Sequence, residues 1–171
     1  MAASVDVVEF QLGKEHYALD IKIAREIVEM MPITPLPRAP PYLAGIINLR
    51  GEITNIIDLR DLLGLPDSGE SENRKIVVLM PEVAGGSNVG IIVDDVHSVI
   101  SVREDQIERI NDSITSSISS YIKAIIKIGD AERAKTESLI IWLDVQKVIN
   151  DLGGNYQSAQ IVSTKIVDHF L

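Results

Sequence analysis

The amino-acid sequence predicts a mainly β protein with two related β subdomains and a few short helices. Short apolar runs separated by polar turns recur along most of the 171 residues, a pattern typical of strands joined by hairpins. Five prolines between residues 32 and 41 exclude a helix and a central strand there. A strand, an aspartate, a short helix and a glycine follow one another twice, in 55–64 and in 140–153. Two copies of one unit indicate two subdomains, each closed into a small barrel that hides its strand edges.

The first half of the chain is expected to hold two hairpins and a short helix. Gly51 can adopt the positive φ that a tight hairpin turn needs. Asp58 is placed to cap a helix that Gly64 ends. The stretch 23–31 fits either one helix or a helical turn followed by a strand. The expected elements are strands over 5–12, 17–21, 46–49 and 53–57 and a helix over 59–63.

The second half is expected to continue with strands and to end in a helix and a tail. Asp144 is placed to cap a helix that Gly153 ends. Apolar residues near helical spacing in 156–171 favour an amphipathic helix, which docks either on the body of the protein or on a partner. Residues 66–74, 103–120 and 129–137 are polar and are expected to be loops or irregular. The expected strands cover 75–80, 88–93, 96–102, 121–128 and 138–143, and the expected helix covers 145–152.

The composition excludes several classes of protein. The chain carries 16 basic and 25 acidic residues, and its net charge of −9 repels nucleic acid and anionic membrane surfaces. The absence of cysteine excludes disulfide scaffolds, thiolate zinc sites and thiol catalysis. The longest apolar runs span five residues, whereas a membrane helix needs about 20. Because the N-terminus also lacks the features of a signal peptide, we expect a soluble protein without direct membrane insertion.

No catalytic or metal-binding pattern is evident in the sequence. His16, His97 and His169 are scattered and match no metal-binding spacing, so we expect ordinary surface or half-buried histidines. Asp94 and Asp95 are expected to point to opposite faces of a solvated turn, which does not suit a shared acid–base site. The sequence therefore predicts no catalytic residue, no metal site and no cofactor. The alternative, a small-molecule-binding or enzymatic β-barrel, would need polar groups that converge on an apolar pocket.

The segment Asn48-Leu49-Arg50-Gly51 is the most distinctive polar feature of the chain. Its arginine stands at the tip of an otherwise apolar hairpin, where a guanidinium is either solvated or paired with a carboxylate. The residues alone leave both alternatives open.

A series of short motifs occurs in a fixed order between residues 7 and 152. The most specific combination is G-x-x-N-L-R-G followed by I-I-D-L and then by V-G-I-I-V-D. The matching segments are Val8–Leu12, Tyr17–Ile21, Glu26-Ile27, Ile33–Pro37, Gly45–Gly51, Ile56–Leu59, Val89–Asp94, Val96, Val99 and Ile140–Asp144. In these motifs and in their order the chain resembles the CheW family.

The resemblance implies a mainly β fold of two five-stranded SH3-like β-barrel subdomains around a shared apolar groove, with a few short helices and a C-terminal helical tail. The CheW-like domain, with its two intertwined subdomains, would cover 1–154 and the tail 155–171. The implied function is that of a non-enzymatic chemotaxis adaptor in two-component signal transduction, without a cofactor. The implied partners are the regulatory domain of the histidine kinase CheA and the cytoplasmic tips of methyl-accepting chemotaxis receptors. The implied location is the cytoplasm, in association with membrane-bound receptor arrays.

The resemblance also indicates which residues bind partners. The candidate partner-binding residues are Ala24, Glu26, Ile27, Gly45, Asn48, Arg50, Gly51, Val96 and Val99. Since the resemblance places the hairpin tip near 23–31, we predict an ion pair between Arg50 and Glu26. Asn55 stands where a proline is usual, the 129–137 turn is longer than typical, and the tail has no counterpart in the family.

Overall fold

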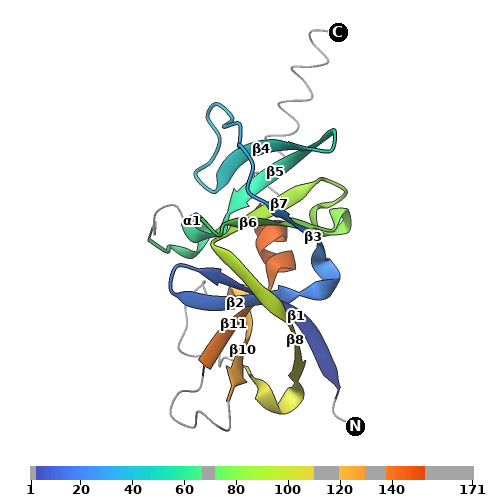
Figure 1. The fold of residues 1–171 in the computed structure, drawn as a ribbon, viewed down its shortest axis with the longest axis vertical. Coiled ribbons are helices and arrows are strands. Elements are labelled where there is room, and N and C mark those ends of the chain that lie inside the picture. The colour runs from blue at the N-terminus through green and yellow to red at the C-terminus, as the bar shows by residue number, and fades with distance from the viewer. Residues whose placement is uncertain (1–2, 67–71, 110–119, 130–137, 153–171) are drawn as a thin grey trace.

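The two β-sheets of the molecule lie one above the other, with the helix over 145–152 between them (Figure 1). This is the arrangement in the computed structural model, and it confirms the predicted mainly β class. No helix in the described part of the chain is long and apolar enough to cross a membrane. The predicted tail helix lies outside the described residues. The structure describes residues 3–66, 72–109, 120–129 and 138–152.

The first sheet contains strands from both ends of the chain. Within the described ranges it has six strands in the order β8-β1-β2-β11-β10-β9, and only β2 and β11 pair in parallel. The resemblance implied five. The additional β9 has two residues and lies in the stretch that was expected to be irregular. The strands are β1 (Ser4–Leu12), β2 (Glu15–Asp20), β8 (Asp95–Arg103), β9 (Ile107–Glu108), β10 (Ile122–Ile128) and β11 (Ser138–Leu143).

The second sheet contains the middle of the chain. Among the described residues it has five strands in the order β3-β6-β7-β5-β4, and β5 and β7 pair in parallel. A single bridge between Thr34 and Ile46 extends the pairing beyond β4. The strands are β3 (Ala24–Glu29), β4 (Leu43–Leu49), β5 (Glu52–Asp58), β6 (Lys75–Leu79) and β7 (Val89–Val93), and short 3-10 turns cover Ile21–Ile23, Pro81–Ala84 and Glu104–Gln106.

The open assignment of 23–31 is resolved in favour of a helical turn followed by a strand. The 3-10 turn Ile21–Ile23 leads directly into β3. Exposed and half-buried residues alternate along β3, so one face of the strand packs and the other meets solvent.

Both short helices are capped by the predicted aspartates, Asp58 and Asp144. The Asp58 side chain accepts a hydrogen bond from the backbone N–H of Arg60 at the start of α1 (Leu59–Leu63), and Gly64 ends this helix with a φ of 68°. The Asp144 side chain accepts one from the N–H of Lys147 in the 145–152 helix.

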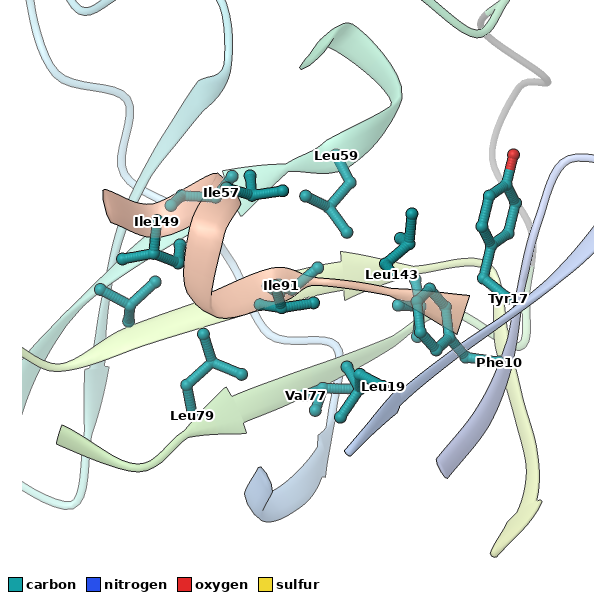
Figure 2. Packing of buried hydrophobic residues seen from close by; sticks show 14 of the residues in the cluster. Phe10, Tyr17, Leu19, Ile57, Leu59, Val77, Leu79, Ile91, Leu143 and Ile149 are labelled. Atoms are coloured by element: carbon teal, nitrogen blue, oxygen red, sulfur yellow. The ribbon is translucent and has the colours of Figure 1, made fainter. Parts of the chain in front are cut away.

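The described side chains form three buried clusters. The central cluster fills the space between the sheets and joins Phe10 and Leu19 to Val77, Ile91 and Ile149 (Figure 2). Neighbouring residues on a strand point to opposite faces, so the burial of nearly every residue of β6 and β7 means that both faces of these two inner strands are covered. The first-sheet cluster comprises Val7, Ala18, Val102, Ala124, Ile126, Ile140 and Trp142. The second-sheet cluster comprises Ile47, Leu49, Ile56, Ile76, Val78 and Ile92.

The two ends of the chain meet in the first sheet. The β1–β2 hairpin pairs with β8 and β11, which come from the second half of the chain. The β6–β7 hairpin pairs with β3 and β5, which precede it in the chain. The second sheet is therefore made by consecutive strands between residues 24 and 93, whereas the first sheet needs strands from both ends of the chain.

Candidate partner-binding surface

The tip of the β4–β5 hairpin is a two-residue turn with an unusual backbone. Leu49 pairs with Glu52, and the two residues between them, Arg50 and Gly51, have φ values of 51° and 86°. Two positive φ values are what a type I′ hairpin turn requires. The Asn48 side-chain oxygen accepts a hydrogen bond of 2.8 Å from the N–H of Gly51 and holds the turn closed. A non-glycine residue at positive φ costs about 1–2 kcal/mol, so Arg50 is held in place by its surroundings.

The predicted ion pair between Arg50 and Glu26 is formed. The Arg50 guanidinium Nη2 donates to the Glu26 carboxylate Oε1. A second pair of reversed polarity joins Arg25 Nη1 to Glu52 Oε2 at 3.7 Å. The side chain of Arg50 is 62% exposed and that of Glu26 is 27% exposed, so solvent screens their attraction. An exposed pair of this kind contributes under about 1 kcal/mol to stability.

These two ion pairs connect strands that do not pair with each other. In the second sheet β3 is one edge, and β6 and β7 lie between it and the β4–β5 hairpin. The Arg50–Glu26 and Arg25–Glu52 pairs therefore bring the hairpin tip back to the opposite edge and help to close the sheet on itself. Their main effect is to orient a charged surface, because the energy that they contribute is small.

Gly45 is buried beneath this surface rather than exposed on it. Its φ is 146°, and a Cβ placed there would lie 2.2 Å from the backbone oxygen of Thr34 and 2.8 Å from Ile33 Cγ2. The segment that contains Thr34 pairs with Ile46 through two backbone hydrogen bonds of 2.9 Å. Glycine at this position permits the close approach of two backbones, so Gly45 shapes the surface from below.

The other candidate residues are divided between the two sheets. On β3, Ala24 packs against the central cluster and Ile27 is exposed. On β8, an edge strand of the first sheet, Val96 packs against the central cluster and Val99 is exposed. The structure thus brings Glu26, Asn48, Arg50 and Gly51 together at one tip. It places Val99 on the edge of the other sheet.

Asp94 was expected in a solvated turn, and that prediction is wrong. Its side chain is buried at the junction of β7 and β8, where it accepts a hydrogen bond of 2.6 Å from the N–H of Gly13. Its Oδ1 lies 3.6 Å from Arg60 Nη1 and 3.5 Å from Arg74 Nε. The chain passes between the sheets at this point, so the carboxylate joins them. A backbone N–H and two guanidinium groups from distant segments create this environment, and the local sequence carries no signal for it.

His16 is half-buried and His97 is exposed, as expected, but the two lie together, which their spacing in the sequence did not indicate. The rings of His16 and His97 stack with their centroids 4.9 Å apart. His16 Nδ1 lies 2.9 Å from Glu9 Oε2. These histidines are 81 positions apart in the chain. The pairing of β1 with both β2 and β8 brings them into contact. The third histidine, His169, lies outside the described residues.

Comparisons with known proteins agree with this fold. A family model described as the CheW-like domain matches residues 6–153. The chain belongs to the CheW family. A relative named chemotaxis protein CheW from Treponema pallidum is 34% identical over 148 residues, which cover 84% of this chain and 81% of the relative. The protein of the same name from Bacillus subtilis is 31% identical over 121 residues, which cover 71% and 76%.

A solved structure gives the same result. The crystal structure of scaffolding protein TtCheW from Thermoanaerobacter tengcongensis superposes with a TM-score of 0.70 at 33% identity, covering 84% of this chain and 86% of that one. The chain is accordingly a CheW chemotaxis scaffolding or adaptor protein, and the family is not catalytic. The alternative of an enzymatic β-barrel is thereby set aside.

Proposed function

We propose that this adaptor couples methyl-accepting chemotaxis receptors to the histidine kinase CheA through direct protein–protein contacts. The coupling takes place in the cytoplasm, at membrane-bound receptor arrays, without a cofactor and without insertion into the membrane. Residues 1–154 act as the adaptor domain, and residues 155–171 are an appendage to it. The observation that carries the proposal is the paired charged surface at the β4–β5 tip.

The tip has the chemistry of a protein-binding surface. The exposed apolar Ile27 lies two positions after Arg25 on β3, and the exposed Ile53 directly follows Glu52 on β5. Exposed apolar side chains flanked by oriented charges suit an interface whose apolar part contributes affinity and whose charges select the partner. We assign this surface, with Arg50 and Glu26 at its centre, to the regulatory domain of CheA.

The β8 edge suits a different partner. Val99 is exposed on this edge strand, and Val96 and Ala24 lie half-buried against the central cluster. An amphipathic helix from a receptor tip would place its apolar anchors against such residues. We therefore assign Val96 and Val99, together with the apolar residues Ile21, Ile23 and Ala24, to the receptor.

Two matched pairs of variants test the assignments. Val99→Asp is compared with Leu139→Asp, because these side chains are 52% and 55% exposed and both lie on the first sheet. Arg50→Asn is compared with Arg103→Asn, because both arginine side chains are 62% exposed and ion-paired. Binding of each variant to a receptor signalling tip and to the CheA regulatory domain is measured by titration calorimetry.

We expect Val99→Asp to weaken receptor binding at least about tenfold, and Arg50→Asn to weaken kinase binding by a similar factor, about 1.4 kcal/mol each. The Leu139 and Arg103 variants should bind both partners as the unmodified chain does. If Val99→Asp binds the receptor tip with unchanged affinity, the β8 assignment is rejected. If the unmodified chain binds neither partner, the proposed coupling itself is rejected.

A further inference from the structure

We propose that Glu9, His16 and His97 form a binding site for a divalent transition-metal ion such as Zn²⁺. One ligand atom from each of these residues lies within 4.8 Å of the other two. Imidazole nitrogens and a carboxylate oxygen are a ligand set that zinc and neighbouring metals prefer. This inference is independent of the proposed partner contacts, since none of the three residues is assigned to them.

The strand register explains how the three side chains meet. Val7 of β1 and Ala18 of β2 belong to the first-sheet cluster. Glu9 and His16 each lie two positions away on the same strands and so share that face of the sheet. On β8, Ser98 pairs with Glu9 and Val96 pairs with Phe10, which leaves His97 as the extra residue of a β-bulge. Bulges redirect side chains, and this one brings the His97 ring onto the His16 ring.

A hydrogen bond to Gln11 orients the His97 ring. Gln11 Nε2 donates to the backbone oxygen of Gly13 at 2.8 Å, which leaves Oε1 facing His97 Nε2 at 3.2 Å. Because an amide oxygen can only accept, His97 Nε2 carries the hydrogen and Nδ1 keeps its lone pair. A metal-binding histidine is usually held in this way, with its second nitrogen bonded to an oxygen acceptor.

The site combines a largely buried carboxylate with the more exposed ring of His16. The Glu9 side chain is only 16% exposed, whereas that of His16 is 40% exposed and can rotate. Zinc binds such atoms at about 2.0–2.2 Å, so the ligands of a tetrahedral ion lie about 3–3.5 Å apart. An ion would therefore draw the three atoms closer by side-chain rotation, replace the contact between His16 Nδ1 and Glu9 Oε2, and complete its coordination with water. The chain's net charge of −9 favours the approach of a cation.

An ion held there would connect three strands of the first sheet. It would join the edge strand β8 to β1 and β2 at the bulge, one residue from Val96 and two from Val99. Metal binding would therefore stiffen the edge on which we place receptor contacts. It would also raise the stability of the folded state by mass action, since the unfolded chain does not hold the three ligands together.

The test is a Zn²⁺ titration of the full chain after treatment with a chelator, followed by calorimetry. The variants are His16→Ala, His97→Ala and Glu9→Gln, and His169→Ala is the matched control because it removes the one histidine outside the cluster. We expect one Zn²⁺ to bind the unmodified chain and the His169 variant with the same affinity. Each cluster variant should lose at least about tenfold in affinity.

Two further measurements distinguish a loss of Zn²⁺ binding from a loss of folding in the variants. The melting temperature of the unmodified chain should rise with added Zn²⁺, and that of His97→Ala should not, although both should melt alike in chelator. Addition of Ni²⁺ should broaden the NMR signals of the His16 and His97 rings together. If the unmodified chain binds no Zn²⁺, or if the His16 and His97 variants bind it undiminished, the site is rejected. Loss of binding in His169→Ala alone would place the ion elsewhere and also reject it.

Discussion

The segment 42–64 and the described residues of the segment 121–152 (121–129 and 138–152) are built in the same way. In each, the backbone oxygen of a tyrosine accepts a 2.8 Å hydrogen bond from the N–H of the aspartate that precedes the helix, Tyr42 with Asp58 and Tyr121 with Asp144. Both first strands also shift register just after the tyrosine. The repeat recognised in the sequence is therefore a complete supersecondary unit, and it occurs once in each half of the chain.

The two units differ in the length of their helices. This difference determines whether the hydroxyl of the unit's tyrosine has a hydrogen-bond partner. The first helix ends at Gly64, whereas the second extends at least to 152. The longer helix supplies Asp151, to which the Tyr121 side chain is hydrogen-bonded. The Tyr42 hydroxyl is buried and has no hydrogen-bond partner among the described residues. A repeated pattern can thus reproduce a fold while leaving one copy less well satisfied.

The two units differ also in the segment that lies beside their first strands, β4 and β10. In the first unit the Thr34 segment crosses so close to β4 that the residue after the register shift is Gly45. In the second unit β9 pairs with β10, and the corresponding residue is the fully buried Ala124. The same position therefore tolerates a methyl group in one copy and excludes it in the other.

The largest effect is expected for Gly45→Ala. The added methyl would clash with the Thr34 backbone and hold an alanine at positive φ, which should lower the free energy of unfolding by more than about 3 kcal/mol. The reciprocal Ala124→Gly should lower it by only about 1 kcal/mol. Urea denaturation measures both. Equal losses in the two variants would show that the neighbouring segments do not distinguish the units.

The next largest effect is expected for Asp58→Ala. This carboxylate caps α1 and lies 3.3 Å from Nε and from Nη2 of the buried Arg60, so its removal should cost about 2–3 kcal/mol. Asp144 caps its helix by accepting from the N–H of Lys147, and Asp144→Ala should cost about 1 kcal/mol. Thermal and urea unfolding give the comparison. A larger loss for Asp144→Ala would contradict the role given to Arg60.

The tyrosines should respond to the same substitution with opposite signs. Tyr42→Phe removes an unpaired buried hydroxyl and should raise the free energy of unfolding by about 1 kcal/mol. Tyr121→Phe breaks the hydrogen bond to Asp151 and should lower it by about 1 kcal/mol. Both variants are measured in parallel urea titrations. If both are stabilised, the proposed difference between the paired Tyr121 hydroxyl and the unpaired Tyr42 hydroxyl is wrong.

Alkaline pH extends this test. Burial raises the pKa of Tyr42 above its ordinary value of about 10, and burial followed by Asp151 raises the pKa of Tyr121. A folded-state pKa above the unfolded value stabilises the fold below pH about 10, and this stability is lost as the pH rises through the folded-state pKa. The free energy of unfolding should therefore decline as the pH is raised from 9 to 11, about one unit on either side of the ordinary tyrosine pKa. The decline should be shallower in Tyr42→Phe.

The smallest effect on stability is expected at the hairpin tip. In a double-mutant cycle of Arg50→Ala and Glu26→Ala, the coupling energy should be under about 1 kcal/mol, because the pair is exposed. Arg50→Asn should change stability by no more than about 1 kcal/mol, since asparagine tolerates positive φ. A coupling above about 3 kcal/mol would mean that the pair behaves as a buried one and governs the fold of the first unit.

Much of the fold and part of the site can be predicted from the sequence. The helix caps at Asp58 and Asp144 and the tight turn at Gly51 follow from contacts between residues close together in the chain. The Arg50–Glu26 pair was predicted only through family resemblance, because 24 residues separate its members. The partner-binding roles of these residues stay a prediction.

The sequence by itself determined the local units of this protein: its hairpins, its two strand–aspartate–helix segments and their repetition. Only the tertiary structure decided that strands from both ends of the chain build the first sheet, that Asp94 is buried, and that Glu9, His16 and His97 meet. The physical reason is the range of the interactions. A cap or a tight turn is a contact within a few residues, whereas strand pairing brings together segments some 80 to 100 residues apart and depends on where every other strand has already packed.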